Sequence, residues 1–404
     1  MASFGRKYLY GLLACALALG LWAGLGGNAL AKGGSAFKWK TTFQSEFLYD
    51  SNIYKLSDTQ ISRLDANKAA DRTSGRFNDM KSADDFILTP RLKVTLSTPG
   101  LGGKELKISP NVLYNLYLQS QKKSHLVSGL DLRQTVGAHD TLGLDFKYAP
   151  NVFKKNYLTG TTNPSGPVLD SERIYGAATY DRIDVEASYR HRLWKKPGGK
   201  AGSTGIEKVY GTATVGLQSK EYDAPFRNRN EDSILGGAGL DLEFGKGAVL
   251  AFSYLFKSIN TPTDPEILIR NETDFGVDLN ADGDALDLDV ATVQRVNRSR
   301  LEHKLGVKFK GDINDQWEGF FKYDIRLQDY QSTETFDVTR IDRQDFRHRF
   351  GLGFKGDYGS HWTLGFEGRY TIEDADRAGL ATVNQAEQKS YNRYELGATL
   401  SYRL

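Results

Sequence analysis

The chain is poor in cysteine, methionine and proline, and it lacks an excess of charge of one sign. Its 404 residues include one Cys, two Met and ten Pro, with 53 basic residues against 50 acidic ones. A single cysteine, Cys15, excludes an intrachain disulfide and a thiolate metal site. The near balance of charge gives no argument for a nucleic-acid partner.

Long apolar runs are also missing after residue 31. Mean hydropathy is −0.48, and no later segment has the roughly twenty apolar residues of a membrane helix. Aromatic residues and glycine are plentiful, with 21 Tyr, 21 Phe and 42 Gly. Barrels that cross membranes hide their apolar residues in alternation, so their mean hydropathy resembles that of soluble proteins. If this chain spans a membrane, it must do so with strands in a closed barrel.

The first 31 residues have the three parts of an export signal. Arg6 and Lys7 form a basic start, residues 8–25 are apolar, and a small-x-small motif ends at Ala31. We therefore expect a cleaved signal peptide over residues 1–31. The alternative is an uncleaved anchor helix, although the apolar run is short for a membrane span. Cleavage would remove the only cysteine and leave a mature net charge of +1.

Apolar and polar residues alternate through most of the remaining chain, which is the period of a β-strand. In residues 361–371, Trp362 and Phe366 fall on one face, while Glu367 and Arg369 fall on the other. A soluble sandwich also alternates, but its apolar face is buried in a core. Here the polar face is heavily charged in strand after strand. We infer that the apolar face meets lipid and the charged face lines a lumen.

The alternation predicts an all-β fold, with residues 32–404 forming a single closed antiparallel transmembrane β-barrel of about fourteen strands; twelve or sixteen strands are the alternatives. The predicted strands are 36–49, 85–98, 104–119, 124–137, 141–154, 173–194, 206–220, 232–245, 248–259, 297–310, 316–330, 343–355, 361–373 and 388–404. Short turns between them alternate with long connections, which is typical of short periplasmic turns and long extracellular loops. Segment 173–194 shifts register near Asp181, so it is either one bulged strand or a hairpin.

Two similar strand–turn–strand units carry aromatic residues beside their turns. Phe309 precedes one turn and Trp317 follows it, while Phe354 and Trp362 bracket the other. Trp and Tyr favour the membrane–water interface. We expect these four residues to belong to a periplasmic aromatic girdle.

The last strand resembles the β-signal that the barrel-assembly machinery recognises. Gly397, Leu400 and Tyr402 match its glycine and apolar positions, whereas Leu404 stands where such proteins usually end in Phe or Trp. The resemblance implies a Gram-negative bacterial outer-membrane protein, in contact with outer-membrane lipid and lipopolysaccharide.

Residues 47–54, FLYDSNIY, are similar to the opening of several outer-membrane barrel families. Some of these families are linked to exopolysaccharide export or to surface-lipoprotein assembly. The resemblance covers eight residues, and it implies an outer-membrane barrel without specifying its cargo.

The charged face predicts a porin-like channel for small hydrophilic solutes with a mild anion preference, because rings of charge set selectivity. A mixed lumen with no preference is the alternative. The basic residues predicted to line the pore are Arg91, Lys93, Arg133, Lys147, Arg190, Arg192, Arg300, Lys304, Lys322, Arg326, Arg347, Arg349 and Arg369. Other possible functions are a barrel component that exports polysaccharide or surface lipoprotein, a conduit for an electron-transfer partner, or a structural or adhesive protein.

The predicted loop 260–296 contains an acidic pattern that resembles the calcium loops of EF-hands and dockerins. Its candidate ligands are Asp278, Asn280, Asp282, Asp284 and Asp289. Oxygen ligands at such spacing, with Gly283 at the sharp turn, suit calcium. Leu286 offers no side-chain ligand, and an acidic surface loop without metal is the alternative.

Catalytic residues are hard to find in the sequence. Of six histidines, His191, His303 and His348 are expected to face lipid, and His139 and His361 are expected to lie at turns. This leaves His125 beside Ser124 as the only candidate. Because no partner for this pair can be named, we expect the protein not to be an enzyme.

Overall fold

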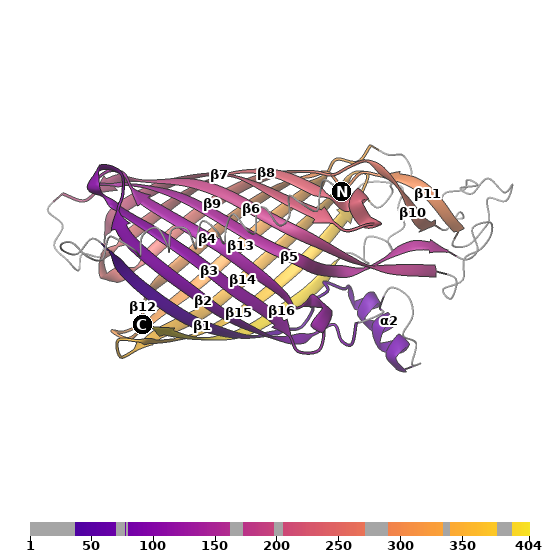
Figure 1. Cartoon of the computed structure of the whole chain (residues 1–404), viewed down its shortest axis with the longest axis horizontal. Helices are drawn as coiled ribbons and strands as arrows, with labels where there is room; N and C mark the ends of the chain where they lie inside the picture. The colour runs from indigo at the N-terminus through magenta and orange to yellow at the C-terminus, as the bar shows by residue number, and fades with distance from the viewer. Residues whose placement is uncertain are drawn as a thin grey trace, which may run out of the picture.

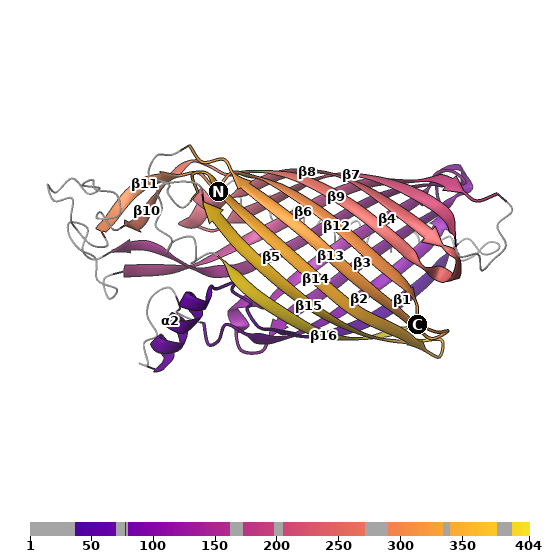
Figure 2. The same cartoon turned by 180° about the vertical axis from the view of Figure 1, so that it is seen from behind.

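The computed structural model describes residues 37–69, 77, 80–161, 173–197, 205–270, 290–333, 340–377 and 390–404. Fourteen strands form one closed antiparallel barrel in the order β1-β16-β15-β14-β13-β12-β9-β8-β7-β6-β5-β4-β3-β2 (Figures 1 and 2). This confirms the predicted all-β fold and strand number. The predicted signal peptide lies outside the described residues.

The barrel strands are β1 (Lys38–Asp50), β2 (Asp85–Pro99), β3 (Glu105–Tyr117), β4 (His125–Thr135), β5 (Asp140–Thr161), β6 (Arg173–Lys195), β7 (Ile206–Tyr222), β8 (Glu231–Phe244), β9 (Val249–Asn260), β12 (Arg300–Asp312), β13 (Trp317–Tyr330), β14 (Arg343–Tyr358), β15 (Trp362–Arg377) and β16 (Tyr391–Arg403). Most begin and end within three residues of the predicted bounds. The exceptions are mainly at the ends of strands that run further than predicted, above all β5.

The outer face of the barrel is apolar. Large side chains such as Phe47, Leu352 and Leu396 are exposed at every second position along their strands. The register places Phe47 opposite Leu88 on one side and Ala398 on the other, so the exposed apolar positions of neighbouring strands are adjacent. An exposed apolar surface this continuous is unusual in a soluble monomer and fits a lipid-facing band.

Pairing of the first and last strands closes the barrel. β1 pairs with β16 from Thr42 opposite Arg403 to Asp50 opposite Glu395. Closure pairs backbone donors and acceptors that an open sheet would leave free at its edges, a requirement for strands in lipid.

The two ends of the barrel differ in their connections. Tight turns and the C-terminus lie at one end, and we call it the turn end (Figure 1). Two of its turns contain glycines with positive φ, Gly102 at +62° and Gly359 at +61°, which only glycine adopts at no steric cost. The longer connections lie at the other end, the loop end.

The ambiguous segment 173–194 is a single strand, β6. β5 and β6 together run beyond the other barrel strands at the loop end (Figure 1). The register shifts fall on β5, between Ala149 and Val152, between Phe153 and Lys155, and between Leu158 and Gly160. The register shift predicted near Asp181 is therefore caused by bulges in the neighbouring strand β5, and the number of barrel strands remains even.

Two connections predicted as loops contain further structure. The connection 50–84 includes helix α2 (Asp58–Ala69), and the connection 260–296 includes the hairpin of β10 (Asp264–Arg270) and β11 (Val290–Val296). The signal for α2 was present in the sequence, because Ser57 and Gln60 have the spacing of a capping box. The Ser57 hydroxyl accepts the Gln60 backbone N–H at 3.3 Å. No helix among the described residues is long and apolar enough to cross a membrane.

Candidate functional site

The inner face of the barrel carries the charged residues. The thirteen basic residues predicted to line the pore all lie on this face, at positions that alternate with the exposed apolar ones. For example, Arg91 and Lys93 flank the exposed Leu92, and Arg349 precedes the exposed Phe350. The period-two pattern therefore assigned the inward positions as the structure has them.

In the turn-end half of the lumen, cations and anions pair across neighbouring strands while remaining partly open to water. Arg133 binds Asp131 and Asp145, each at 2.9 Å. Arg190 binds Asp241 at 3.0 Å. The Arg133 side chain is 38% exposed and that of Asp145 23%. These pairs lie in a wet interior, where an ion pair contributes about 0–1 kcal/mol.

In the loop-end half, the ion pairs are drier. Glu231 binds Lys220 at 2.6 Å and Arg300 at 3.2 Å. Arg326 binds Glu373 at 2.7 Å, and both of these side chains are only 11% exposed. Removing one partner of such a pair leaves a buried charge uncompensated, which is costly.

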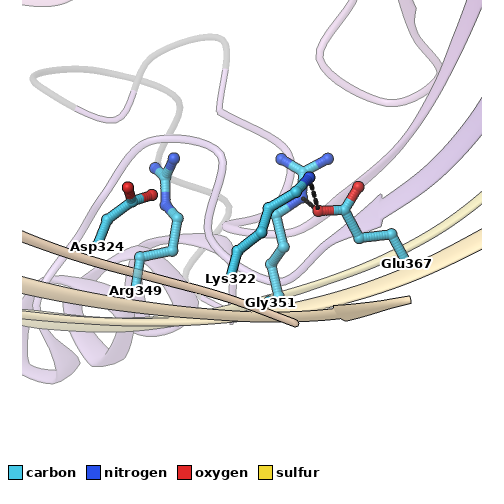
Figure 3. A pocket seen from close by; sticks show the side chains of 6 residues that line it. Lys322, Asp324, Arg349, Gly351 and Glu367 are labelled. Carbon is cyan, nitrogen blue, oxygen red and sulfur yellow. Dashed lines mark hydrogen bonds and ion pairs between the residues drawn. The ribbon is translucent and has the colours of Figure 1, made fainter. Parts of the chain in front are cut away.

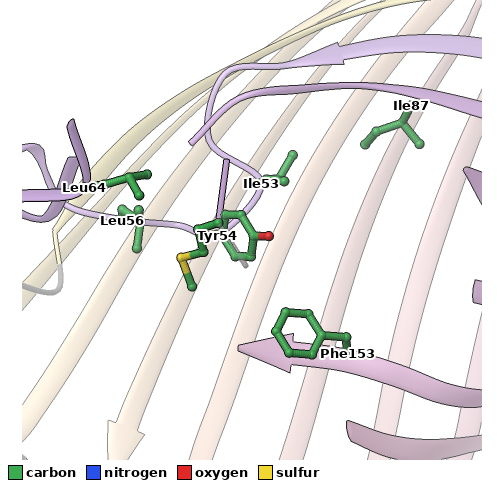
Figure 4. Packing of buried hydrophobic residues seen from close by; sticks show 7 residues of the cluster. Ile53, Tyr54, Leu56, Leu64, Ile87 and Phe153 are labelled. Carbon is green, nitrogen blue, oxygen red and sulfur yellow. The ribbon is translucent and has the colours of Figure 1, made fainter. Parts of the chain in front are cut away.

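The loop-end lumen is drier because the chain folds back into it. Ile53 and Tyr54, which directly follow β1, are 8% exposed and belong to one apolar cluster with Ile87 of β2 and Phe153 of β5 (Figure 4). Leu64 of α2 belongs to the same cluster. We call residues 51–56 the mouth turn. The connection 50–84 was predicted only as a long polar loop between the first two strands, and the apolar residues of the mouth turn were the available signal for this contact.

Local hydrogen bonds fix the mouth turn. The Asn52 side chain accepts the Leu56 N–H at 2.8 Å and donates to the Leu56 carbonyl oxygen at 2.7 Å. Asp50 accepts the Asn52 N–H at 3.0 Å and receives the Arg393 guanidinium of β16. The YDSN residues that resemble other barrel openings therefore build this turn, in which Lys55 has a positive φ of +55°.

Two lysines stand at the mouth outside the strands. Lys55 belongs to the mouth turn, and Lys123 ends the short helix η2 (Gln121–Lys123) with its ammonium 4.5 Å from the Tyr54 ring centroid. Burial lowers the pKa of both Lys55 and Lys123 to about 7, and the like charge of Lys154 on β5 lowers each further. Both ammonium groups therefore change charge near neutral pH.

A pocket of about 310 Å³ lies on the inner wall between the two halves (Figure 3). Lys322 and Arg369 both bind Glu367 there, at 3.3 and 3.2 Å. Arg349 points into the same pocket, and its Nε is buried without a hydrogen-bond partner. The Arg349 guanidinium in this pocket therefore forms no ion pair with a described acidic residue.

The predicted girdle residues cluster on the outer face at the turn end. The Trp317 and Phe354 ring centroids lie 5.4 Å apart, and those of Trp362 and Tyr402 lie 4.6 Å apart. Phe309 is 48% exposed on the same face.

The predicted β-signal residues lie on the strand that closes the barrel. Leu400 is exposed on the outer face, and Leu404 is exposed at the chain end. Gly397 faces inward opposite Leu48.

The remaining predicted sites are less informative. His125 contacts Asn115 and the Lys123 carbonyl oxygen, while the Ser124 hydroxyl accepts the Tyr117 N–H, so these contacts do not form a nucleophile–base pair. The candidate calcium ligands Asp278 to Asp289 lie outside the described residues. Among the residues that are described, no group of three His, Cys, Asp or Glu is placed to hold a metal ion.

Comparison with solved structures finds other outer-membrane barrels. The anion-selective porin from Comamonas acidovorans is 12% identical, with 92% of this chain and 100% of that chain covered and a TM-score of 0.39. The outer membrane channel DcaP of Acinetobacter baumannii is 11% identical, with 93% and 99% covered and a TM-score of 0.43. A bacterial polysaccharide outer membrane secretin is 10% identical, with 90% and 98% covered and a TM-score of 0.37.

Likenesses of this size carry no argument about what this chain transports. No family model matches the chain, and no curated protein matches its sequence. Its own architecture gives the class: a closed fourteen-strand barrel, apolar outside and charged inside, is a β-barrel of the bacterial outer-membrane kind.

Proposed function

We propose that the protein is an outer-membrane channel for small hydrophilic solutes, with a preference for anions. Outer-membrane barrels have short periplasmic turns and long extracellular loops, so the turn end would face the periplasm and the loop end the outside of the cell. The supporting observation is the partly exposed charge along the inner wall, such as Arg133 and Arg190 at 38% and 41%. Charges are costly to remove from water, so this wall fits a water-filled passage.

The anion preference is supported by cations that lack partners. Lys55, Lys154, Arg347 and Arg349 form no ion pair with another described residue, whereas the nearby acids Glu231 and Glu373 are paired with other cations. An excess of positive charge in a narrow, partly desolvated passage favours anions.

Planar-bilayer recording of the purified protein tests this function. We expect stepwise conductance, with a reversal potential of the sign set by chloride in a KCl gradient. Arg347→Glu should move the reversal potential toward that of potassium, whereas Lys104→Glu, in an exposed turn outside the lumen, should leave it unchanged. A folded barrel that never conducts would contradict the proposal.

A barrel that works with an export or conduit partner is the second candidate. The mouth turn favours it, because Ile53 and Tyr54 occupy the loop end of the lumen. This function predicts low conductance that rises when the mouth turn is loosened.

A further inference from the structure

The unpaired cations of the loop-end lumen come from opposite sides of the barrel. Lys154 belongs to β5, and Arg347 and Arg349 belong to β14. In the closed order of fourteen strands, β5 and β14 are seven positions apart, which places them directly across the lumen from each other.

Lys154 belongs to the wall opposite β14, and Lys55 of the mouth turn lies within range of charges on both walls. The charges that act most strongly on Lys154 are Glu231 of β8 and Arg300 of β12, and Glu373 of β15 also acts on it. After Lys154, the charges that act most strongly on the Lys55 ammonium are Glu373 of β15, Arg326 of β13 and Arg347 of β14. Both lysines therefore lie inside the passage, where the surrounding walls enclose them although water still reaches their side chains.

The bulges of β5 explain how Lys154 comes to face inward. Register shifts on both sides of residues 152 and 153 break the strict alternation of this strand. Bulges re-aim side chains in this way. Phe153 therefore joins the apolar cluster of the mouth while its neighbour Lys154 faces the charges of the far wall.

Arg347 and Arg349 form no ion pair with any residue in the described part of the chain. They are two residues apart on the inner face of one strand, about 7 Å from each other, and the Nε of each is buried without a hydrogen bond. Glu373 lies opposite Arg347 in the register, but it binds Arg326 at 2.7 Å and accepts the Tyr391 hydroxyl at 2.9 Å. Adjacent guanidinium groups without a counter-charge are costly, so an anion from solution would stabilise them.

We propose that the loop-end lumen binds a small solute with two or more anionic groups, carboxylate or phosphate, held by Arg347 and Arg349 on one side, by Lys154 on the opposite side and by Lys55 of the mouth turn. Guanidinium forks match carboxylate and phosphate oxygens, and lysines add point charges. Cations on opposite walls suit a solute with anionic groups at both ends better than a single chloride. The inference rests on the proposed anion channel and names its substrate class.

The test measures citrate and inorganic phosphate separately as blockers of the chloride current through the purified full-length barrel. We expect reversible block by citrate, which should weaken about tenfold or more in Lys154→Gln and in Arg347→Gln, as loss of a charged contact predicts. Arg347→Lys should bind less tightly than the native protein, since lysine cannot form the fork. Block by inorganic phosphate as strong as that by citrate would contradict the requirement for two anionic groups, because phosphate carries only one, and much weaker block by phosphate supports it.

Two further variants make the test specific. Lys55→Asn removes the charge while tolerating the positive φ of this position, and it should also weaken citrate block. Lys308→Gln is the matched control, because Lys308 also lies unpaired among the described residues of the inner face, but nearer the turn end. Citrate block that is unchanged in Lys154→Gln and Arg347→Gln, or that falls equally in Lys308→Gln, overturns the site.

Calorimetric titration of citrate into the detergent-solubilised barrel separates the site from the channel. Binding that is lost in Arg347→Gln, in a barrel that does not conduct, supports the site and contradicts the proposed function. Conductance without citrate binding supports the channel and contradicts the site.

Discussion

The two halves of the lumen are lined by the same residue types but differ in how water reaches them. At the turn end, Arg133 and Asp145 form their pair at 38% and 23% exposure. At the loop end, the side chains of Arg393 and Asp50 form theirs at 15% and 2%. The mouth turn and the apolar cluster around it account for the difference, because they displace water from one end of a tube that is otherwise wet.

This contrast shows that charge alone does not define a functional site in a barrel. Ion pairs in contact with water contribute little to stability, whereas ion pairs next to the apolar cluster of the mouth contribute more. The unpaired cations at the dry end are therefore a better guide to solute binding than the total charge of the lumen.

The largest expected effect is on stability. Arg393→Gln leaves Asp50 buried without its 2.8 Å guanidinium partner at the β1–β16 seam, and should lower the free energy of unfolding by about 3 kcal/mol. Arg133→Gln, the matched change in the wet half, should cost about 1 kcal/mol or less. Urea unfolding in lipid vesicles measures both.

Equal losses in the two variants would remove the energetic distinction between the halves. If Arg393→Gln does not fold, Arg326→Gln tests the same point at a second dry pair, with Glu373 as the stranded acid.

The next largest effect is on the mouth turn. Leu56 is 1% exposed, so Leu56→Ala should cost about 2–5 kcal/mol of packing that holds this turn in place. We expect higher single-channel conductance and faster proteolysis within residues 51–84. Leu352→Ala, on the lipid-facing surface at 67% exposure, is the control and should change neither. Unchanged conductance in Leu56→Ala would show that the mouth turn does not restrict the passage.

A smaller effect concerns pH. The pKa values of Lys55 and Lys123, lowered to about 7 from an ordinary value of 10.5, mean that both lysines are charged below neutrality and neutral above it. Anion preference should therefore fall as the pH rises from about 6 to about 8, well below the range in which an exposed lysine titrates. Reversal potentials in a KCl gradient report this change.

The double variant Lys55→Asn/Lys123→Gln should flatten the pH profile, and a profile as steep as that of the native protein would count against these two lysines. Because the unfolded chain binds more protons between pH 7 and pH 10.5, the lysines also make folding stability rise with pH across that window.

The smallest expected effect concerns the acidic segment that joins β10 to β11 in the sequence. If Asp278, Asn280, Asp282, Asp284 and Asp289 bind calcium, millimolar calcium should slow proteolysis of this segment and EDTA should reverse the protection. Asp282→Asn should remove the difference. A cleavage pattern that ignores both calcium and EDTA would leave only an acidic loop.

The sequence by itself determined the barrel and its inside. Alternation is a local property with period two, so it placed Arg133, Lys322 and Arg349 on the inner face without knowledge of any neighbour. Because backbone polar groups must be paired inside a membrane, the same pattern also predicted that the barrel is closed.

Only the tertiary structure decided what fills the mouth and which charges remain unpaired. The place of Ile53 and Tyr54 depends on contacts with Ile87 and Phe153, which are remote in sequence. The inward aim of Lys154 depends on bulges defined against β6. Arg347 has no ion-pair partner among the described residues because Glu373 binds Arg326 instead. Such competition between strands cannot be predicted from the alternation within a single strand.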